Sequence, residues 1–357
     1  MKRNLPAEAI GPNYSTSFYV GSFLIVLLLC LPTYFNNYRL LATDAVPADS
    51  YFQMVQYWAG DRSEDVLVDP TSYRVALPLL AVIPYRFLPP LRLNRLGSDT
   101  DLQRVRAVQA ITLVNFVGVV FALFTTLLLI LQQGLPRWIS WLTMGIVFYF
   151  MNYMALAGID PWAVAWLNLL LLSKRLWVYL LLLLVSVAMN EKIAMAMLLF
   201  HIPYWFFERR RSFPSRGLFA VVALAIYFSI RQVYPLGGHE YMFTPSRYYD
   251  SILASLALLF SVKGLYMNVF PLLLILLLYY LTWKNRLFDN TPNNSWCCLF
   301  VFVGFFVIGL VTRLEYTIGR LALHGLSFFI VPIGLLLWKF FTVEHLAKTV
   351  ENVEEVW

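Results

Sequence analysis

Long apolar runs separated by short polar segments make up most of the chain. An apolar helix needs roughly 20 residues to cross the hydrocarbon core of a bilayer, and a spanning segment must be a helix or a strand of a closed barrel because no water satisfies its backbone there. The runs do not alternate as barrel strands do, so each predicts a helix. They lie near residues 17–36, 73–91, 107–131, 138–157, 161–173, 176–189, 193–207, 217–230, 265–283, 296–311 and 321–341.

This pattern predicts an all-α fold, a polytopic transmembrane bundle of ten or eleven helices, some of them short or re-entrant. We expect one transmembrane domain over 1–357, with a first external loop at 37–72, a second at 231–264 and a cytoplasmic tail helix at 343–357. The composition agrees: 60% of residues are apolar and 13% are charged, whereas soluble proteins average about 45–50% and about 25%. The mean hydropathy is +0.67.

Charge changes the picture only slightly. The net charge of +7 would favour a nucleic-acid partner in a soluble protein, but here the basic residues punctuate apolar runs, as orientation signals do, so we expect no nucleic acid. The cysteines Cys30, Cys297 and Cys298 have neither the spacing of a disulfide framework nor that of a metal site.

The Lys/Arg bias predicts the orientation. We place on the cytoplasmic side Lys2, Arg3, Lys174, Arg175, Arg209, Arg210, Arg211, Arg216, Lys284 and Arg286. The external side then receives 37–72, the turn at 190–192, 231–264 and 312–320. Three apolar runs separate the first external loop from Asp160. If Asp160 is also external, an even number of crossings must lie between them. One of them must stop short, and the proline-broken run 73–91 is a candidate.

The segment 37–72 is the richest in polar chemistry. It is longer than packing requires, and loops of that kind are usually functional or disordered. Its aromatic residues from Tyr51 to Trp58 form an amphipathic pattern suited to the membrane surface, so we expect it to fold against the bundle. Most of its acids are interpreted as solvated, whereas Asp49 starts the amphipathic stretch as a helix cap or a base. The acids are Asp44, Asp49, Asp61, Glu64, Asp65 and Asp69.

Other polar residues lie at the ends of apolar runs. Arg74 opens the second run, as an interfacial anchor or an anion ligand. Asp160 precedes Pro161 and suits a helix N-cap. Glu191 and Lys192 stand between two apolar helices, where an ionisable group costs about 2.5–3.5 kcal/mol unless it is paired or hydrated; a polar cavity and a mutual ion pair both remain open.

The second half adds bases on the same predicted face. Arg320 and His324 are four residues apart and share a helical face. Arg313 and Glu315 suit an interfacial anchor, and a lone histidine such as His239 is more often solvated than a ligand. The candidates for substrate binding in this half are Arg231, His239, Arg313, Arg320 and His324. No Walker, Rossmann or zinc-protease pattern occurs, so the predicted site needs no nucleotide.

The order of these features resembles the GT-C superfamily of polytopic glycosyltransferases. The likeness rests on the stretch from Asp49 to Trp58, on Asp69 to Arg74 with Leu77-Pro78, on Gly158 to Pro161 and on Asn190 to Lys192, and covers roughly the first 200 residues. The resemblance implies transfer of a sugar from a polyprenyl-phosphate donor to a lipid-linked or glycan acceptor. It also implies a bacterial inner (plasma) membrane location with the site on the external, periplasmic face, in cell-envelope glycan biosynthesis.

The resemblance also implies roles for residues. By position Asp49 matches the acceptor-side base and Asp44 is the reserve, with Asp69 and Asp160 as further candidates. The family often has two adjacent acids, whereas four residues separate Asp44 from Asp49 here. No cofactor is implied, and a divalent metal is compatible but not required. A carboxylate would take the acceptor proton while arginines stabilise the departing phosphate, and we expect Arg320, with Arg313 and His324, to hold that phosphate.

Two other classes stay open. A lipid or solute transporter, or a flippase, also needs buried charges, but should have two related halves with paired broken helices, which the sequence does not display. A membrane polysaccharide polymerase or acyltransferase would use a histidine base. His201, His239 and His324 are the candidates, and His201 is assigned to packing because it lies in an apolar run close to Pro203.

Overall fold

The protein is all-helical throughout the part that the computed structural model describes. This part comprises residues 15–43, 49–63, 75–90, 102–155, 160–207, 215–233, 252–254, 256, 257, 259–262, 265, 269–285, 287, 295–311 and 323–354. The elements are α1 (Thr16–Thr43), α2 (Asp49–Trp58), α3 (Ala76–Phe87), α4 (Leu102–Gln132), α5 (Arg137–Ala155), α6 (Asp160–Leu172), α7 (Leu176–Met189), α8 (Glu191–Phe207), α9 (Ser215–Val233), α12 (Phe270–Lys284), α13 (Ser295–Val311), the 3₁₀-helix η6 (Leu323–Phe328) and α15 (Ile330–Glu354).

Each predicted apolar run coincides with a helix, but some boundaries differ: α1 continues to Thr43, seven residues into the segment predicted as the first external loop. The last run is divided into η6 and α15 at Phe329, and α15 continues through most of the segment that the sequence assigns to the tail. The acidic segment 37–72 contains α2, whose apolar face buries Tyr51, Phe52, Met54 and Val55. The expected folding of this segment against the bundle is therefore confirmed for α2.

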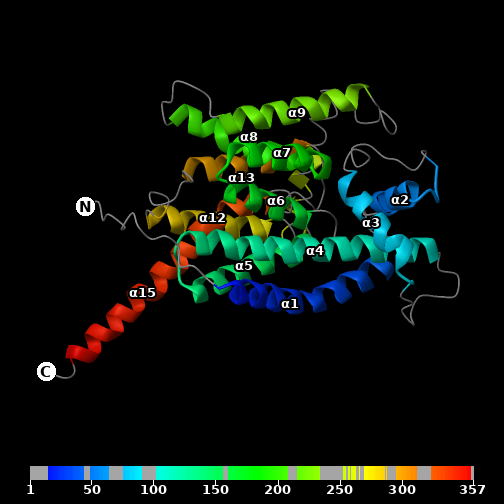
Figure 1. Cartoon of the computed structure of the whole chain (residues 1–357). Coiled ribbons are helices and arrows are strands. Elements are labelled where there is room, and N and C mark those ends of the chain that lie inside the picture. Colours follow the sequence, from blue (N-terminus) through cyan, green and yellow to red (C-terminus); the bar gives the residue numbers. More distant parts are fainter. Residues whose placement is uncertain are drawn as a thin grey trace.

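Helix α4 is the centre of the bundle. Its 31 residues give a length of about 46 Å at 1.5 Å per residue, and it packs against α1, α3, α5 and α6 (Figure 1). Its apolar residues are buried on several faces. The other helices surround this axis: α7 and α8 lie beyond α6, α9 covers α7 and α8, and α15 lies against α5.

Buried polar side chains join α4 to α6. Asn168 Nδ2 donates to Thr125 Oγ1 at 3.1 Å, to Thr126 Oγ1 at 3.2 Å and to the Ala122 carbonyl at 3.3 Å. Trp162, further toward the start of α6, donates from Nε1 to the Val114 carbonyl at 2.8 Å. The residue numbers at these contacts increase in the same direction along both helices, from Val114 with Trp162 to Thr125 with Asn168, so α4 and α6 run parallel. Hydrogen bonds of this kind hold helices together where apolar side chains alone give no directional preference.

The bundle has two distinct ends (Figure 1). At one end, which we call the α2–α3 end, α1 and α7 finish and α4, α6 and α8 begin. At the other, which we call the opposite end, α4, α6 and α8 finish and α5, α7 and α9 begin. Helix α3 has 12 residues, which corresponds to about 18 Å. It lies at the α2–α3 end beside α2 and the start of α4. Of the three runs between the first loop and Asp160, 73–91 forms the shortest helix, and whether it crosses a membrane stays a prediction.

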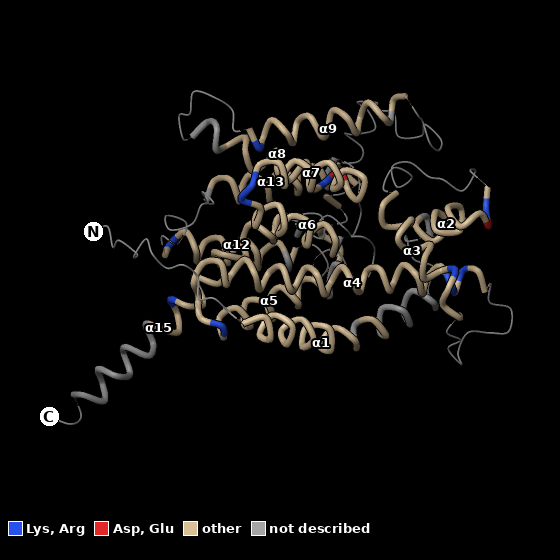
Figure 2. The backbone as a smooth tube through the Cα atoms, in the orientation of Figure 1, with Lys and Arg blue, Asp and Glu red and all other residues tan. Residues whose placement is uncertain are grey.

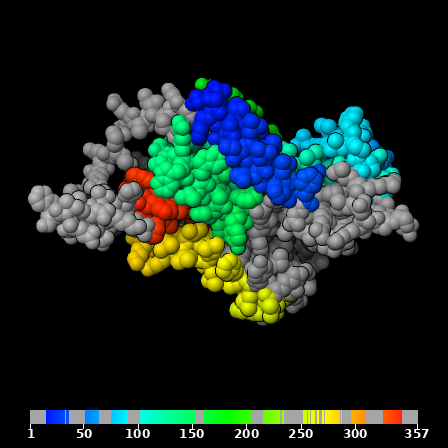
Figure 3. Space-filling model, turned by 90° about the horizontal axis from the view of Figure 1, so that it is seen from below, coloured from blue at the N-terminus to red at the C-terminus, as the bar shows by residue number. Residues whose placement is uncertain are grey.

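Specific contacts tie α2 to α3. The chain leaves α2 through Gly60, whose φ of 85° suits glycine, and Asp61 N donates to the Gln56 carbonyl at 2.8 Å. Tyr85 Oη then donates to the Asp61 carboxylate. Arg86 Nη2 donates to the Ala59 carbonyl at 3.0 Å. The two short helices therefore form one unit, which projects at one end of the space-filling view (Figure 3).

The outer faces of the bundle are apolar. Leu28 is 63% exposed, Trp177 59% and Leu273 58%, whereas Lys and Arg gather near the helix ends (Figure 2). Among the described helices, α4 alone is long and apolar enough to cross a membrane by length and composition, and shorter apolar helices surround it.

Candidate functional site

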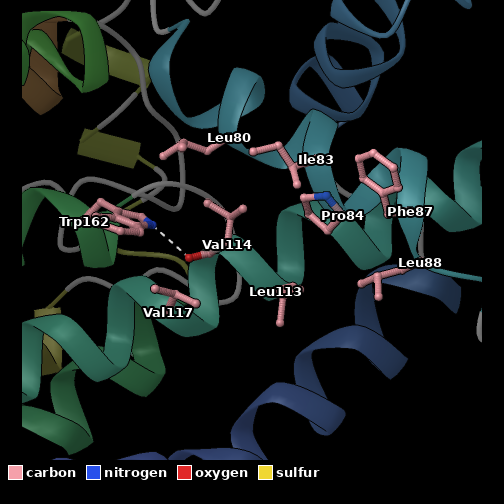
Figure 4. A pocket seen from close by; sticks show the side chains of 9 residues that line it. All are labelled: Leu80, Ile83, Pro84, Phe87, Leu88, Leu113, Val114, Val117 and Trp162. Carbon is pink, nitrogen blue, oxygen red and sulfur yellow. Dashed lines mark hydrogen bonds between the residues drawn. The ribbon is translucent and has the colours of Figure 1, made fainter.

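An apolar groove lies at the α2–α3 end between α3 and α4. Its volume is about 470 Å³, within the range of about 300–1,000 Å³ typical of ligand pockets. Leu80, Ile83, Pro84 and Phe87 share one face of α3, because their spacing follows the helical repeat. The remaining walls come from the end of α3, from α4 and from α6 (Figure 4), namely Leu88, Leu113, Val114, Val117 and Trp162.

Trp162 forms the wall of the groove that comes from α6. Its indole reaches from α6 to α4 and is fixed there by the hydrogen bond to the Val114 carbonyl (Figure 4). The ring lies directly on Gly118, where an added Cβ would be 2.6 Å from Cδ1 of Trp162. It also stacks on Phe121, with ring centroids 6.2 Å apart. Glycine at position 118 therefore permits the indole to lie against α4.

Arginines flank the groove on the side where α3 ends. Arg86 is exposed and precedes the lining residue Phe87, but its guanidinium is bound to the Ala59 carbonyl at the end of α2. Arg106 is also exposed and lies seven residues before Leu113, so both side chains leave the same face of α4. Arg106 and Leu113 are about 10 Å apart along the axis of α4. The groove is thus apolar along its length and cationic beside one end.

The α7–α8 hairpin brings polar groups to the same end of the bundle. A single residue, Asn190, separates the two helices. Its Oδ1 accepts a hydrogen bond from Lys192 N at 3.1 Å and caps α8. Glu191 and Lys192 follow in the first turn of α8 and are half-buried. The two interpretations of this turn, a polar cavity and a mutual ion pair of Glu191 and Lys192, both stay predictions.

The antiparallel register of α6 and α7 gives the position of this hairpin along the bundle axis relative to the groove, which has no lining residue from the hairpin. Trp166 Nε1 donates to the Leu182 carbonyl at 2.6 Å. Because the helices are antiparallel, Trp162, one turn before Trp166, is level with Ser186, one turn after Leu182. The Ser186 carbonyl accepts a hydrogen bond from Asn190 N at 2.7 Å. Asn190 is therefore about one turn, or about 6 Å along the axis, beyond the Trp162 wall.

The backbone also brings other predicted residues to this end. Asp160 begins α6, two residues before Trp162, and Asp49 begins α2. His324 lies in η6, three residues before Ser327, whose hydroxyl donates to the Val164 carbonyl at 3.4 Å. Arg231 lies near the end of α9. For these four residues only the backbone is described.

The remaining predicted residues lie outside the described part of the chain: Asp44, Asp69, Arg74, His239, Arg313 and Arg320. Their proximity to the groove stays a prediction. The sequence interpretation missed Arg86, Arg104 and Arg106 and the amide of Asn190. A signal for the arginines was present, because five of them occur between 86 and 106. Since cations thus occur at both ends of the bundle, the predicted orientation also stays a prediction.

Two groups set aside from the sequence behave as expected of packing. His201 is 8% exposed, its ring lies against Phe200, and Phe200 stacks on Phe328 at 4.7 Å. The cysteines Cys30, Cys297 and Cys298 are buried and unbridged. Within the described residues, no three His, Cys, Asp or Glu side chains come together in a way that could hold a metal.

The comparisons with known proteins assign no family. No protein-family model matches the chain, and neither the curated proteins nor the solved structures contain a match.

Proposed function

We propose that the protein is a polytopic membrane glycosyltransferase of the GT-C type, which moves a sugar from a polyprenyl-phosphate donor to an external lipid-linked or glycan acceptor. The observation that carries the proposal is the apolar groove at the α2–α3 end, flanked by exposed arginines and close to the polar α7–α8 hairpin. An amphiphilic donor needs these three surfaces together: an apolar track for its chain, cations for its phosphate and hydrogen-bonding groups for its sugar.

The membrane part of the proposal is supported by the distribution of side chains. Large apolar residues cover the outer faces of α1, α7, α9 and α12, a pattern that is unfavourable in water over contiguous patches of this extent. The charged residues at the helix ends suit the interfaces of a bilayer. We infer that α4 crosses the membrane and that the shorter helices cross with it, leaving α2 and α3 at the external surface.

The proposed reaction uses groups at this end of the bundle. The acceptor hydroxyl attacks the anomeric carbon of the donor sugar, the bond to the phosphate oxygen breaks, and the polyprenyl phosphate leaves with its electron pair. Asp49 is proposed to take the hydroxyl proton. Arginines stabilise the growing charge on the phosphate, and the groove keeps the chain in place during the displacement.

The test is sugar transfer by membranes that contain the protein. Membranes from an expressing strain are incubated with a radiolabelled polyprenyl-phosphate sugar, and labelled glycolipid or glycan products are separated. We expect a product that is absent from membranes carrying an Asp49→Asn variant and present with Arg62→Ala, a change at an exposed arginine just after α2. Absence of product with a panel of donor sugars would contradict the proposal, and equal product with wild-type and Asp49→Asn membranes would remove Asp49 as the base.

A further inference from the structure

Asn190 has one hydrogen-bonding group that lacks a partner within the described residues. Its backbone N donates to the Ser186 carbonyl at 2.7 Å, and its carbonyl accepts from Ile193 N at 3.1 Å. Its Oδ1 accepts from Lys192 N at 3.1 Å. Its Nδ2, which carries two donors, has no partner among the described residues, although the residue is only 1% exposed.

The orientation of this amide is determined by its neighbours. Lys192 N is a donor and needs an acceptor, so Oδ1 must face it. Turning the amide round would set two donors against each other. The unpaired group is therefore Nδ2. A buried donor without a partner costs about 1–3 kcal/mol, and such groups are rare unless a ligand or water completes them.

The position distinguishes Asn190 from other buried amides. Asn115 and Asn168 each have an unpaired Oδ1, but a carbonyl-type oxygen is more often left under-satisfied than a donor. Asn168 also lies among α4 side chains, and its Nδ2 is fully used there. Asn190 instead lies at the α2–α3 end, about one turn beyond the Trp162 wall of the groove.

We propose that Asn190 Nδ2 donates a hydrogen bond to a carbohydrate hydroxyl of the substrate. The amide is neutral, and the Glu191 and Lys192 side chains that follow it carry opposite charges, so this hairpin offers hydrogen bonds without net charge. A hydroxyl accepts from Nδ2 and can itself donate to a carboxylate. The phosphate has a separate cationic partner at the arginine side of the groove. This assignment rests on the proposed glycosyl transfer and makes Asn190 a determinant of sugar recognition.

The chain offers a clean substitution. In Asn190→Asp and Asn190→Ser the side chain still caps α8, because Asp and Ser are as good N-caps as Asn, but the Nδ2 donors are lost. Asn190→Ala removes both the cap and the donors. Asn190→Ser should therefore stay close to the thermal unfolding midpoint of the wild type and Asn190→Ala should lower it, whereas Asn190→Asp also buries a carboxylate and should lower it too.

The test measures KM for the donor and for the acceptor separately with the purified variants. We expect about a tenfold rise in one KM for both Asn190→Asp and Asn190→Ser; a rise for the donor identifies the transferred sugar, and a rise for the acceptor identifies the accepting glycan. Unchanged KM values for both substrates would overturn the assignment, as would a loss of thermal stability in Asn190→Ser as large as that in Asn190→Ala.

A second measurement does not depend on catalysis. The thermal stabilisation of each variant is measured with a prenyl-phosphate sugar, with a lipid-linked acceptor glycan, and with the corresponding lipids without sugar. The wild type should be stabilised more by at least one sugar-bearing lipid, and Asn190→Ser should lose that difference. Equal differences in the two proteins would overturn the assignment of Asn190. A wild type that shows the difference but transfers no sugar would instead remove the proposed reaction.

Discussion

At the opposite end of the bundle cations are used for structure, whereas at the α2–α3 end polar groups are left available. Arg216 Nη2 donates to the Ser173 carbonyl at 2.8 Å and to the Lys174 carbonyl at 3.3 Å, and its guanidinium lies 5.1 Å from the centre of the Tyr179 ring. These bonds satisfy carbonyls after the end of α6 and join the α6–α7 turn to α9. Lys339 likewise donates to Asn285 Oδ1 at 2.9 Å.

The α2–α3 end differs in kind. Arg106 is exposed on the face of α4 that continues into the groove, and Asn190 retains two buried donors without a described partner. Tyr85 and Arg86 at this end are used for structure as well, because they bind the segment at the end of α2. The difference teaches that a charged side chain at a helix end indicates a functional site only when it is not already hydrogen-bonded to the backbone at a helix terminus.

The proposal that the α2–α3 end faces the outside of the cell predicts that cysteines at the two ends differ completely in their labelling. Ser63 and Gln133 are exposed at the α2–α3 end and the opposite end, and the native cysteines are fully buried. In intact cells an impermeant maleimide should label Ser63→Cys and not Gln133→Cys. Both should react after permeabilisation, which is the control. Labelling of Gln133→Cys alone would reverse the orientation.

The largest expected kinetic effect belongs to Asp49. Asp49→Asn should lower the transfer rate by about 10²–10⁴-fold, because loss of a general base has effects of that size. The matched control is Asp61→Asn, which replaces the charged acceptor for Tyr85 with a neutral amide oxygen and should lower stability slightly without abolishing turnover. If Asp49→Asn kept more than about half of the activity, the base would be sought at Asp44, Asp69 or Asp160.

The phosphate ligand is a choice between two arginines. If Arg320 binds the donor phosphate bidentately, Arg320→Lys should weaken the donor by about tenfold at constant charge. If Arg106 binds it, Arg106→Ala should weaken the donor by a similar factor of about ten, more at low salt than at high salt. Arg62→Ala is the control for an exposed arginine at the same end. Donor affinity, measured in detergent, identifies the ligand; no effect from either Arg320→Lys or Arg106→Ala would leave the phosphate to Arg74 or Arg231.

The smallest effect on function is expected from Arg216. Arg216→Ala should lower the free energy of unfolding by about 1–2 kcal/mol, because carbonyls after α6 lose their charged donor. The rate of transfer per folded molecule should not change. The thermal midpoint and the specific activity of the same preparation test both statements. A loss of activity at unchanged stability would contradict the separation of roles between the two ends.

The helices were largely predictable from the sequence, because each apolar run is long enough to exclude a barrel strand and is bounded by polar or proline-containing turns. Asp160 begins α6 and Asn190 separates α7 from α8, as the positions of the polar residues indicate. The parity argument required one run to stop short. The prolines of 73–91 made it the candidate, although its apolar length alone resembles that of a crossing helix.

The groove and the amide of Asn190 could not be predicted in this way. The groove exists because Trp162 lies on Gly118, and nothing in the two local sequences pairs position 162 with position 118. Asn190 was visible as a polar residue between two apolar runs, but whether its Nδ2 finds a partner depends on every side chain around it. The sequence determined which segments are helical and which of their faces are apolar. The tertiary structure decided which faces meet, because helical periodicity fixes the direction of each side chain from its own axis and not the neighbour that it contacts.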